Sequence, residues 1–226
     1  MKEKVMRAGE VLDVEIDGRR GLTAQLVAAV SAVCDRAEDH GAAVVMLTVR
    51  GGTGDDAPLP DIALLTKWEG ALRRLERLPA ASVAAMWGPC AGVALDTALA
   101  ADYRIAHPEA ELVPQDASGD IWPGMALYRM GRLSQRAPVR RAVLFGTPVG
   151  ADDALTAGLV DEVTQDPVSA AGQLVARLTG VWGPDLAIRR DLLRGAGAEF
   201  EAALGGHLAA CDRVLRHRTG SGSASS

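Results

Sequence analysis

Residues 11–16, Val-Leu-Asp-Val-Glu-Ile, alternate apolar and charged positions from Leu12 onward. This alternation predicts a strand with one buried face. Two continuous apolar runs, 43–49 and 82–87, predict strands that are buried on both faces. The stretches before and between these runs have helical spacing, and they predict helices that begin after Thr23 and at Asp61 and end before Gly41 and Pro79.

The alternation of strands and helices predicts an α/β fold. Residues 92–100 read as a further helix after a glycine-rich turn, and 101–106 return to strand character. Beyond Val139 the pattern is almost entirely helical, with segments at 140–146, 151–158, 167–180 and 184–217. We therefore expect an α/β core over 1–165, a helical oligomerisation region over 166–218 and a low-complexity, disordered tail over 219–226.

Composition excludes several classes of function. Of the 226 residues 48% are hydrophobic, and the formal net charge of −5 comes without a basic stripe, so we expect no nucleic-acid binding. No run of about 18 apolar residues predicts a membrane span, and the first residues lack the apolar stretch of a signal peptide. The three cysteines, Cys34, Cys90 and Cys211, are far apart and form no metal-binding pattern, which favours reduced thiols in a cytoplasmic protein without a metal site.

The Gly-x-Cys-x-Gly pattern over 88–92 allows a nucleophile elbow with Cys90 as the attacking thiol. The histidines argue against it: His107 follows too soon, and His207 and His217 lie in the predicted terminal helices. A proline directly before the cysteine also fits a strained elbow poorly. The favoured interpretation of Cys90 is a small thiol packed in a tight turn.

The same turn offers backbone chemistry. Free N–H groups and the positive end of a helix dipole at Gly92 and Val93 form a candidate oxyanion site. Asp96 lies about one helical turn further on, which would place a carboxylate beside that site, as proton transfer next to an enolate requires. The alternative for Asp96 is an acid that favours the helix dipole or pairs with Arg104, and spacing alone does not decide between them.

Other polar and aromatic side chains are expected to be structural. Asp102 should bond to local backbone or pair with Arg104. The acidic residues of 109–120 are expected to be solvated, and Trp68, Trp122 and Tyr128 to pack at loop and helix surfaces without a chemical role.

Three segments together resemble one family. The segments GPCAGVALDTALAADYRIA (88–106), IWPGMALYRMGR (121–132) and LFGTPVGADDALTAGLVDEV (144–163) are similar, in order and spacing, to motifs of the crotonase (enoyl-CoA hydratase/isomerase) superfamily. The resemblance runs over roughly residues 11–215. It implies an α/β fold built as a spiral of ββα units with a helical C-terminal region, and an acyl-CoA thioester as substrate.

The resemblance also implies a catalytic site. An enolate would be held by backbone N–H groups, one of them at Val93 next to Gly92, and the two glutamates of family hydratases would fall on Asp96 and Asp116. Each aspartate is one methylene, about 1.5 Å, shorter. The family's Phe-x-x-Gly-x-Asp loop has no match over 50–60, so the second oxyanion donor is unassigned. No metal or redox cofactor is implied.

Within the superfamily, the short length, the opening over 17–40 and the aspartate pair look most like the small (DpgB-type) homologue of dihydroxyphenylglycine biosynthesis. That resemblance implies a cytoplasmic dehydratase that assists a type III polyketide synthase in forming 3,5-dihydroxyphenylacetyl-CoA for antibiotic biosynthesis. It also implies a homotrimer or hexamer, with other crotonase homologues as further partners. The alternative is a non-catalytic crotonase-fold protein that stimulates the synthase by binding it or its product.

Overall fold

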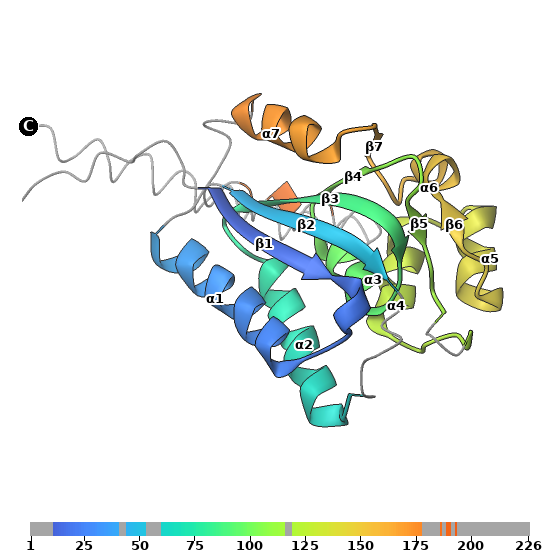
Figure 1. The fold of residues 1–226 in the computed structure, drawn as a ribbon, viewed down its shortest axis with the longest axis horizontal. Helices are drawn as coiled ribbons and strands as arrows, with labels where there is room; N and C mark the ends of the chain where they lie inside the picture. The colour runs from blue at the N-terminus through green and yellow to red at the C-terminus, as the bar shows by residue number, and fades with distance from the viewer. Residues whose placement is uncertain are drawn as a thin grey trace, which may run out of the picture.

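The computed structural model describes residues 11–40, 44–52, 60–115 and 119–177, together with Leu186, Arg189, Arg190 and Leu193. In these residues the centre of the molecule is a mainly parallel sheet in the order β1-β2-β3-β4-β7, with β5 beside β3 and β6 antiparallel to β5 (Figure 1). The strands are β1 (Val11–Asp17), β2 (Val44–Gly52), β3 (Ala81–Cys90), β4 (Tyr103–Ala106), β5 (Glu111–Leu112), β6 (Val149–Gly150) and β7 (Glu162–Val163).

Helices connect the parallel strands, as the sequence pattern predicts. A 3₁₀ turn, η1 (Gly18–Arg20), leads from β1 toward α1. The α-helices are α1 (Ala24–His40), α2 (Ile62–Leu75), α3 (Gly92–Ala100), α4 (Met125–Leu133), α5 (Ala137–Phe145), α6 (Ala151–Ala157) and α7 (Pro167–Arg177). The first two begin where their caps place them: Thr23 Oγ1 accepts from the Leu26 N–H at 3.1 Å, and Asp61 Oδ1 accepts from the Leu64 N–H at 2.7 Å.

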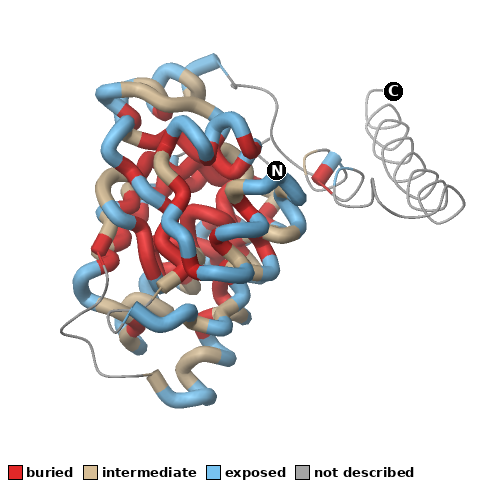
Figure 2. Tube along the Cα trace, turned by 90° about the vertical axis from the view of Figure 1, so that its right-hand side faces the viewer, coloured by how far each residue is buried: buried red, intermediate tan, exposed pale blue. Residues whose placement is uncertain are grey.

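The side chains of the sheet divide between two cores. Alternate residues of β1, β2 and β3, among them Ile16, Leu47 and Met86, pack with α1, α2 and α3 in the larger core. The opposite face of β2 and β3 packs under α7 in a smaller cluster that includes Met46 and Val83. Figure 1 shows α1 and α2 on one side of the sheet and α7 on the other, and Figure 2 shows the buried segments gathered between these layers.

On the edge that faces away from β2, β3 pairs with two different strands along its length. Its first half lies beside β4, with Val83 opposite Tyr103, and its last residues lie beside β5, with Cys90 opposite Leu112. The pairing of β2 with β3 shifts register between Arg50 and Gly52, at the level where β3 leaves β4. The chain therefore winds from one strand set into the next, which agrees with the expected spiral of ββα units.

The structure corrects two sequence predictions. Residues 88–90 continue β3, so the glycine-rich turn before α3 is shorter than predicted, and residues 50–52 continue β2 instead of opening a loop. Both extensions have one cause: Gly52 lies opposite Cys90 in the parallel ladder, so each strand end satisfies backbone groups of the other. The predicted helices of 140–146, 151–158 and 167–180 correspond to α5, α6 and α7. Apart from the four positions already named, the predicted helix of 184–217 lies outside the described residues, as does the tail.

Candidate active site

The candidate site begins where β3 ends and α3 starts. The N-cap of α3 is Ala91, which provides no side-chain hydrogen bond, and no described residue accepts from the N–H groups of Gly92 or Val93. Gly92 adopts a left-handed φ of 47°, which favours glycine, and the side chain of Val93 is buried. The start of α3 therefore presents uncapped backbone donors at the positive end of the helix dipole.

Close backbone packing holds this helix start in place. A Cβ added to Gly51 would lie 2.6 Å from the carbonyl atoms of Pro89, so only glycine lets the end of β2 approach the end of β3 this closely. A Cβ on Gly18, at the end of β1, would lie 3.0 Å from the Ala94 side chain. The ends of three strands are thus packed against each other and against the first turn of α3.

Asp96 lies one turn into α3 and faces the helices α2 and α4. Its Oδ2 accepts a hydrogen bond from Trp68 Nε1 at 3.1 Å, while its Oδ1 is buried without a hydrogen-bond partner among the described residues. Burial, reinforced by the negative charge of Glu69, raises the pKa of Asp96 to about 6, against the lowering effects of the Trp68 N–H, Arg129 and the Ala126 backbone. At neutral pH this carboxyl is much closer to exchanging a proton than an ordinary aspartate.

Arg129, on α4, is the cation that faces this carboxyl. Its Nη1 lies 3.9 Å from Asp96 Oδ1, too far for a hydrogen bond, and Nη1 itself has no partner among the described residues. The other guanidinium nitrogens are engaged: Nη2 binds Glu69 and Nε binds Glu76, each at 2.8 Å. Arg129 is 7% exposed, so these contacts join α2 and α4 through a largely buried ion cluster.

A cavity of about 630 Å³ lies between α2 and α4 beside this cluster. Its polar walls include Glu69, Glu76 and Arg129, the three members of the ion cluster. The apolar walls are formed by the side chains of Ile62, Leu65 and Met125. The cavity is large enough for a small organic group and borders the ion cluster directly.

The two other positions predicted for the site are not described. Asp116 lies outside the described residues, and so does 53–59, which covers most of the loop expected to provide the second oxyanion donor. Their roles stay predictions. Gly92, Val93 and Asp96 do lie on one helix, as expected.

Cys90 is an interior side chain. It is 0% exposed, its Sγ lies near the carbonyl oxygens of Trp87 and Gly88, and burial raises its pKa to about 12. A nucleophilic cysteine needs an accessible thiolate. The packed-thiol interpretation is confirmed, and the elbow hydrolase loses its nucleophile.

Asp102 is structural, as predicted, but neither of the two alternatives for its partner, local backbone or Arg104, is the one observed. It accepts from the backbone N–H and the hydroxyl of Ser82, at 2.8 and 3.0 Å, and pairs with Arg190. Arg104 pairs instead with Asp161 at 3.1 Å. Arg104 is therefore not a partner of Asp96 either, which removes one alternative for that residue.

Two residues of the site, Trp68 and Arg129, are not among the residues predicted from the sequence. Trp68 was expected to pack without a chemical role, yet it is 1% exposed and donates to the carboxylate. Arg129 was not singled out, although it lies inside the segment that resembles the Pro-Gly motif of the family. A tryptophan on the buried face of a predicted helix needs a hydrogen-bond acceptor for its N–H. This requirement is the sequence signal that could have indicated a polar partner for Trp68.

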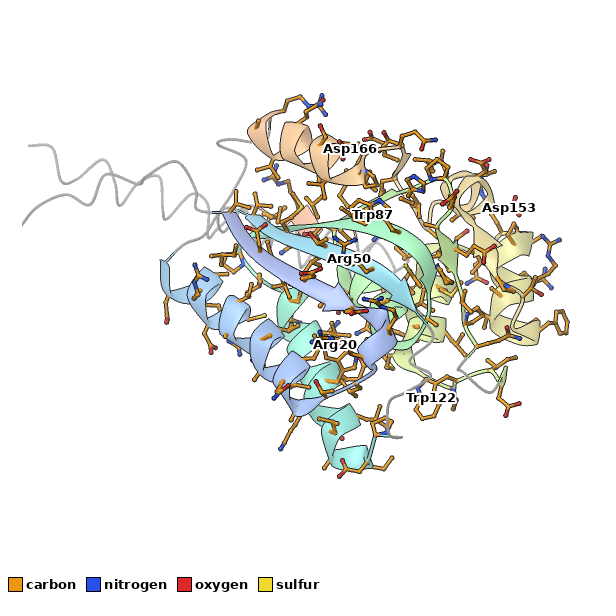
Figure 3. All side chains as sticks on the ribbon, in the orientation of Figure 1. Arg20, Arg50, Trp87, Trp122, Asp153 and Asp166 are labelled. Carbon is orange, nitrogen blue, oxygen red and sulfur yellow. The ribbon has the colours of Figure 1, made fainter. Side chains whose placement is uncertain are left out.

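Basic side chains lie at the carboxyl ends of β1 and β2. Arg20 follows β1 in η1, its side chain 83% exposed, and Arg50 near the end of β2 stacks over Trp87 with 6.0 Å between guanidinium and ring centre (Figure 3). Asp17 and Glu15 pair with these arginines across exposed surface. This edge of the sheet, next to the start of α3, carries exposed arginine side chains that a phosphate group could contact.

Two further features are absent from the described part of the chain. None of the helices found there is long and apolar enough to cross a membrane. The same residues contain no cluster of three or more histidine, cysteine or acidic side chains arranged to hold a metal ion.

Comparison with known proteins places this architecture in a family. The family model described as enoyl-CoA hydratase/isomerase matches residues 60–180, more than half of the chain. The chain belongs to the enoyl-CoA hydratase/isomerase family. The matched residues include β3, α3 and α4, and therefore both Asp96 and Arg129.

The relatives of this enoyl-CoA hydratase/isomerase family member support the same assignment. A protein of Amycolatopsis orientalis named enoyl-CoA-hydratase is 44% identical over 212 residues, which cover 92% of this chain and 97% of that protein. The fatty acid oxidation complex subunit alpha of Aliivibrio fischeri is 29% identical over 167 residues, 66% of this chain and 24% of that protein.

Solved structures show the same fold at low identity. An enoyl-CoA hydratase/isomerase of Marinobacter aquaeolei superposes with a TM-score of 0.75 at 18% identity, covering 93% of this chain and 89% of that one. A putative enoyl-CoA hydratase of Thermobifida fusca, solved in complex with CoA, also gives 0.75, at 20% identity, covering 93% and 91%. The predicted crotonase-like α/β fold is confirmed.

Proposed function

We propose that this protein is a dehydratase of the hydro-lyase type that acts on a CoA thioester of an oxygenated acyl group. The observation that carries the proposal is Asp96: an underbonded carboxyl with a pKa of about 6, one helical turn from uncapped N–H groups at Val93 and Gly92. Proton transfer beside an oxyanion site is the chemistry for which such an arrangement is suited.

The reaction needs one base and one acid. The base, assigned to Asp116, removes a proton from the carbon next to the thioester carbonyl, and the Val93 N–H stabilises the resulting enolate oxygen. Asp96 then gives its proton to the hydroxyl on the following carbon, the C–O bond breaks, water leaves and a C=C bond forms. The assignment of the acid role to Asp96 follows from its raised pKa.

The CoA carrier is supported by the family and by surface charge. The Thermobifida fusca relative in fold was solved with CoA. In this chain, Arg20 and Arg50 lie at the sheet edge beside α3 and could contact the phosphates of the carrier (Figure 3). We infer no metal or redox cofactor, because acid, base and oxyanion donors complete the reaction.

The acyl group we propose is a cyclised polyketide intermediate. In this proposal the protein assists a type III polyketide synthase in forming 3,5-dihydroxyphenylacetyl-CoA for antibiotic biosynthesis, in the cytoplasm, as a homotrimer or hexamer and alongside other crotonase homologues. The cavity between α2 and α4, with its mixed acidic, basic and apolar walls, supports an acyl group that carries oxygen atoms.

The decisive experiment replaces both acids. Wild-type protein and an Asp96→Asn/Asp116→Asn variant are added separately to a type III synthase with malonyl-CoA, and the aromatic CoA product is quantified by mass spectrometry. We expect product with wild type and background with the double variant. Asp153→Asn, an exposed acid on α6 (Figure 3), is the matched control and should retain full activity. Full product formation with the double variant would refute the dehydratase.

One observation favours a second candidate. Oδ1 of Asp96 is buried and Oδ2 is bound to Trp68, so the carboxyl is held more tightly than a freely accessible acid. A non-catalytic partner that stimulates the synthase by binding it or its product would need no exposed carboxyl. In the experiment above, this candidate predicts undiminished stimulation by the double variant.

A further inference from the structure

The carboxyl of Asp96 is held by two helices in an unequal way. Among the side chains, Trp68 of α2 donates to one oxygen, whereas Arg129 of α4 brings its guanidinium to 3.9 Å from the other oxygen without a hydrogen bond. The Ala126 backbone of α4 also favours the ionised form. The two contacts leave Oδ1 as the oxygen whose lone pairs are not engaged by a described residue. If the carboxyl takes up a proton, Oδ1 is the site that is left for it.

The gap between Arg129 and Asp96 has a structural cause. Arg129 Nη2 binds Glu69 and Nε binds Glu76, both at 2.8 Å, and Glu76 also binds Arg73 at 3.1 Å. A guanidinium held by two carboxylates in fixed geometry cannot turn its Nη1 fully onto a third. Glu69 and Glu76 therefore hold Arg129 back from Asp96.

We propose that Trp68 and Glu69, adjacent on α2, are opposing positioning residues for the proton of Asp96. Trp68 fixes the carboxyl so that Oδ1 carries the proton, and it favours the ionised form through its N–H. Glu69 favours the protonated form, both by its own charge and by occupying Arg129. Trp68 does not line the cavity proposed for the acyl group, whereas Glu69 does; both act on the proton through Asp96. Only the expected effect on catalysis rests on the proposed function. The expected effect on the pKa of Asp96 does not depend on it.

The charged and titratable groups near Asp96 agree with this division. On α2 and its end these are Glu69, Glu76 and Arg73, and on α4 the group is Arg129. The end of β1 and η1, which also pack on α3, carry Asp17, Arg19 and Arg20, which pair with one another at exposed surface. Among the described residues, Glu69 is the acid and Arg129 the cation that act on the carboxyl of Asp96.

The test measures the titration of Asp96 directly. Protein labelled with [¹³C]aspartate is titrated by NMR, and the Asp96 carboxyl signal is assigned by its disappearance in Asp96→Asn. Trp68→Phe removes the N–H and should raise the pKa of Asp96, whereas Glu69→Gln removes the charge and frees Arg129, and should lower it. We expect each shift to be about half a pH unit or more, in opposite directions. Asp153→Asn is the control and should leave the titration unchanged.

The opposite directions of the two pKa shifts distinguish a positioning role from a general loss of packing around Asp96. Loss of packing around Asp96 would move both variants in the same direction, toward an exposed aspartate, and that result would overturn the proposal. Equal titration in all variants would also overturn it. Should Trp68→Phe fail to fold, Glu69→Gln and Glu76→Gln must still both lower the pKa of Asp96, because each releases Arg129, and no shift in either refutes the proposal.

Activity provides the second arm. In the dehydratase assay, the pH profile of kcat should shift with the titration of each variant. KM should change little for Trp68→Phe, because Trp68 does not line the cavity. If the titrations shift as expected but wild type has no dehydratase activity, the proposed function fails and the positioning inference stands. If wild type is active but the Asp96 titration is the same in all variants, the positioning inference fails and the proposed function stands.

Discussion

Asp96 and Asp102 lie in the same short segment of chain, one on α3 and the other just beyond its end, and each faces a largely buried arginine. Asp102 is fully bonded: the Ser82 N–H and hydroxyl bind one oxygen, and Arg190 binds the carboxylate. Asp96 has one hydrogen bond, an oxygen without a partner among the described residues, and a guanidinium at 3.9 Å.

The difference shows how a protein distinguishes a structural acid from a reactive one. A carboxylate that receives several charge-assisted hydrogen bonds ties elements of the fold together. A buried carboxyl that receives fewer has a raised pKa and costs stability when it is charged. Asp102 joins β3 to Arg190, whereas in the proposed function the carboxyl of Asp96 exchanges a proton with the substrate.

The largest effect should come from Asp96→Asn. If Asp96 is the proton donor, kcat should fall by about 10²- to 10⁴-fold, the usual contribution of a general acid, while the free energy of unfolding at neutral pH stays equal or rises. Steady-state kinetics and urea unfolding measure the two quantities. A stable variant with wild-type kcat would end the assignment of Asp96 as the acid.

Asp102→Asn should show the reverse pattern. Removing the charge leaves the Arg190 guanidinium, which is 6% exposed, without its ionic partner, and we expect a loss of about 3 kcal/mol in the free energy of unfolding. The value is at the low end for buried pairs because Asp102 itself is partly exposed. Activity per folded molecule should match wild type, and a specific loss of kcat would contradict the comparison.

The pH dependence of stability should separate the two acids next. The pKa of Asp96 is about 6 in the folded protein and 3.8 without the fold, so between these values the folded state holds a proton that the unfolded state has released. The protonated Asp96 therefore adds to the free energy of unfolding below about pH 4. This stabilisation is lost as the pH rises through 6, and the free energy of unfolding decreases by about 2 to 3 kcal/mol. Urea unfolding at pH 4 and 7 should show this decrease in wild type relative to Asp96→Asn, and parallel curves would contradict it.

Local sequence rules predicted most of the fold because each element carries its own signal. The alternation in β1, the apolar runs of β2 and β3 and the caps at Thr23 and Asp61 all depend on neighbours in the chain. The strand ends were misjudged because glycine-rich residues 50–52 and 88–90 have little strand propensity of their own. They are strands because they pair with each other, which no local rule contains.

The site was predictable only in part for a related reason. Asp96 and the helix start at Val93 are neighbours in the chain, so spacing could place them together. Trp68 and Arg129 reach Asp96 from α2 and α4, and the identity of such partners depends on how helices pack. For the same reason Arg104 looked like the natural partner of Asp102, while the structure pairs Asp102 with Arg190, far along the chain.

The smallest expected effect sharpens the comparison from the structural side. Ser82→Ala removes the hydroxyl that binds Asp102 Oδ2 at 3.0 Å and also accepts from the Asp102 N–H, but it leaves the Ser82 N–H and Arg190 in place. Because Ser82 is completely buried, we expect a loss of about 1 to 2 kcal/mol, with no change in kcat or its pH profile. Thermal unfolding and the dehydratase assay measure both. Trp68→Phe is expected to shift the pH profile of kcat through Asp96, whereas Ser82→Ala should not. If Ser82→Ala also shifted that profile, Asp96 and Asp102 would belong to one hydrogen-bond network. The division between a bonded structural acid and an underbonded reactive acid would then not hold.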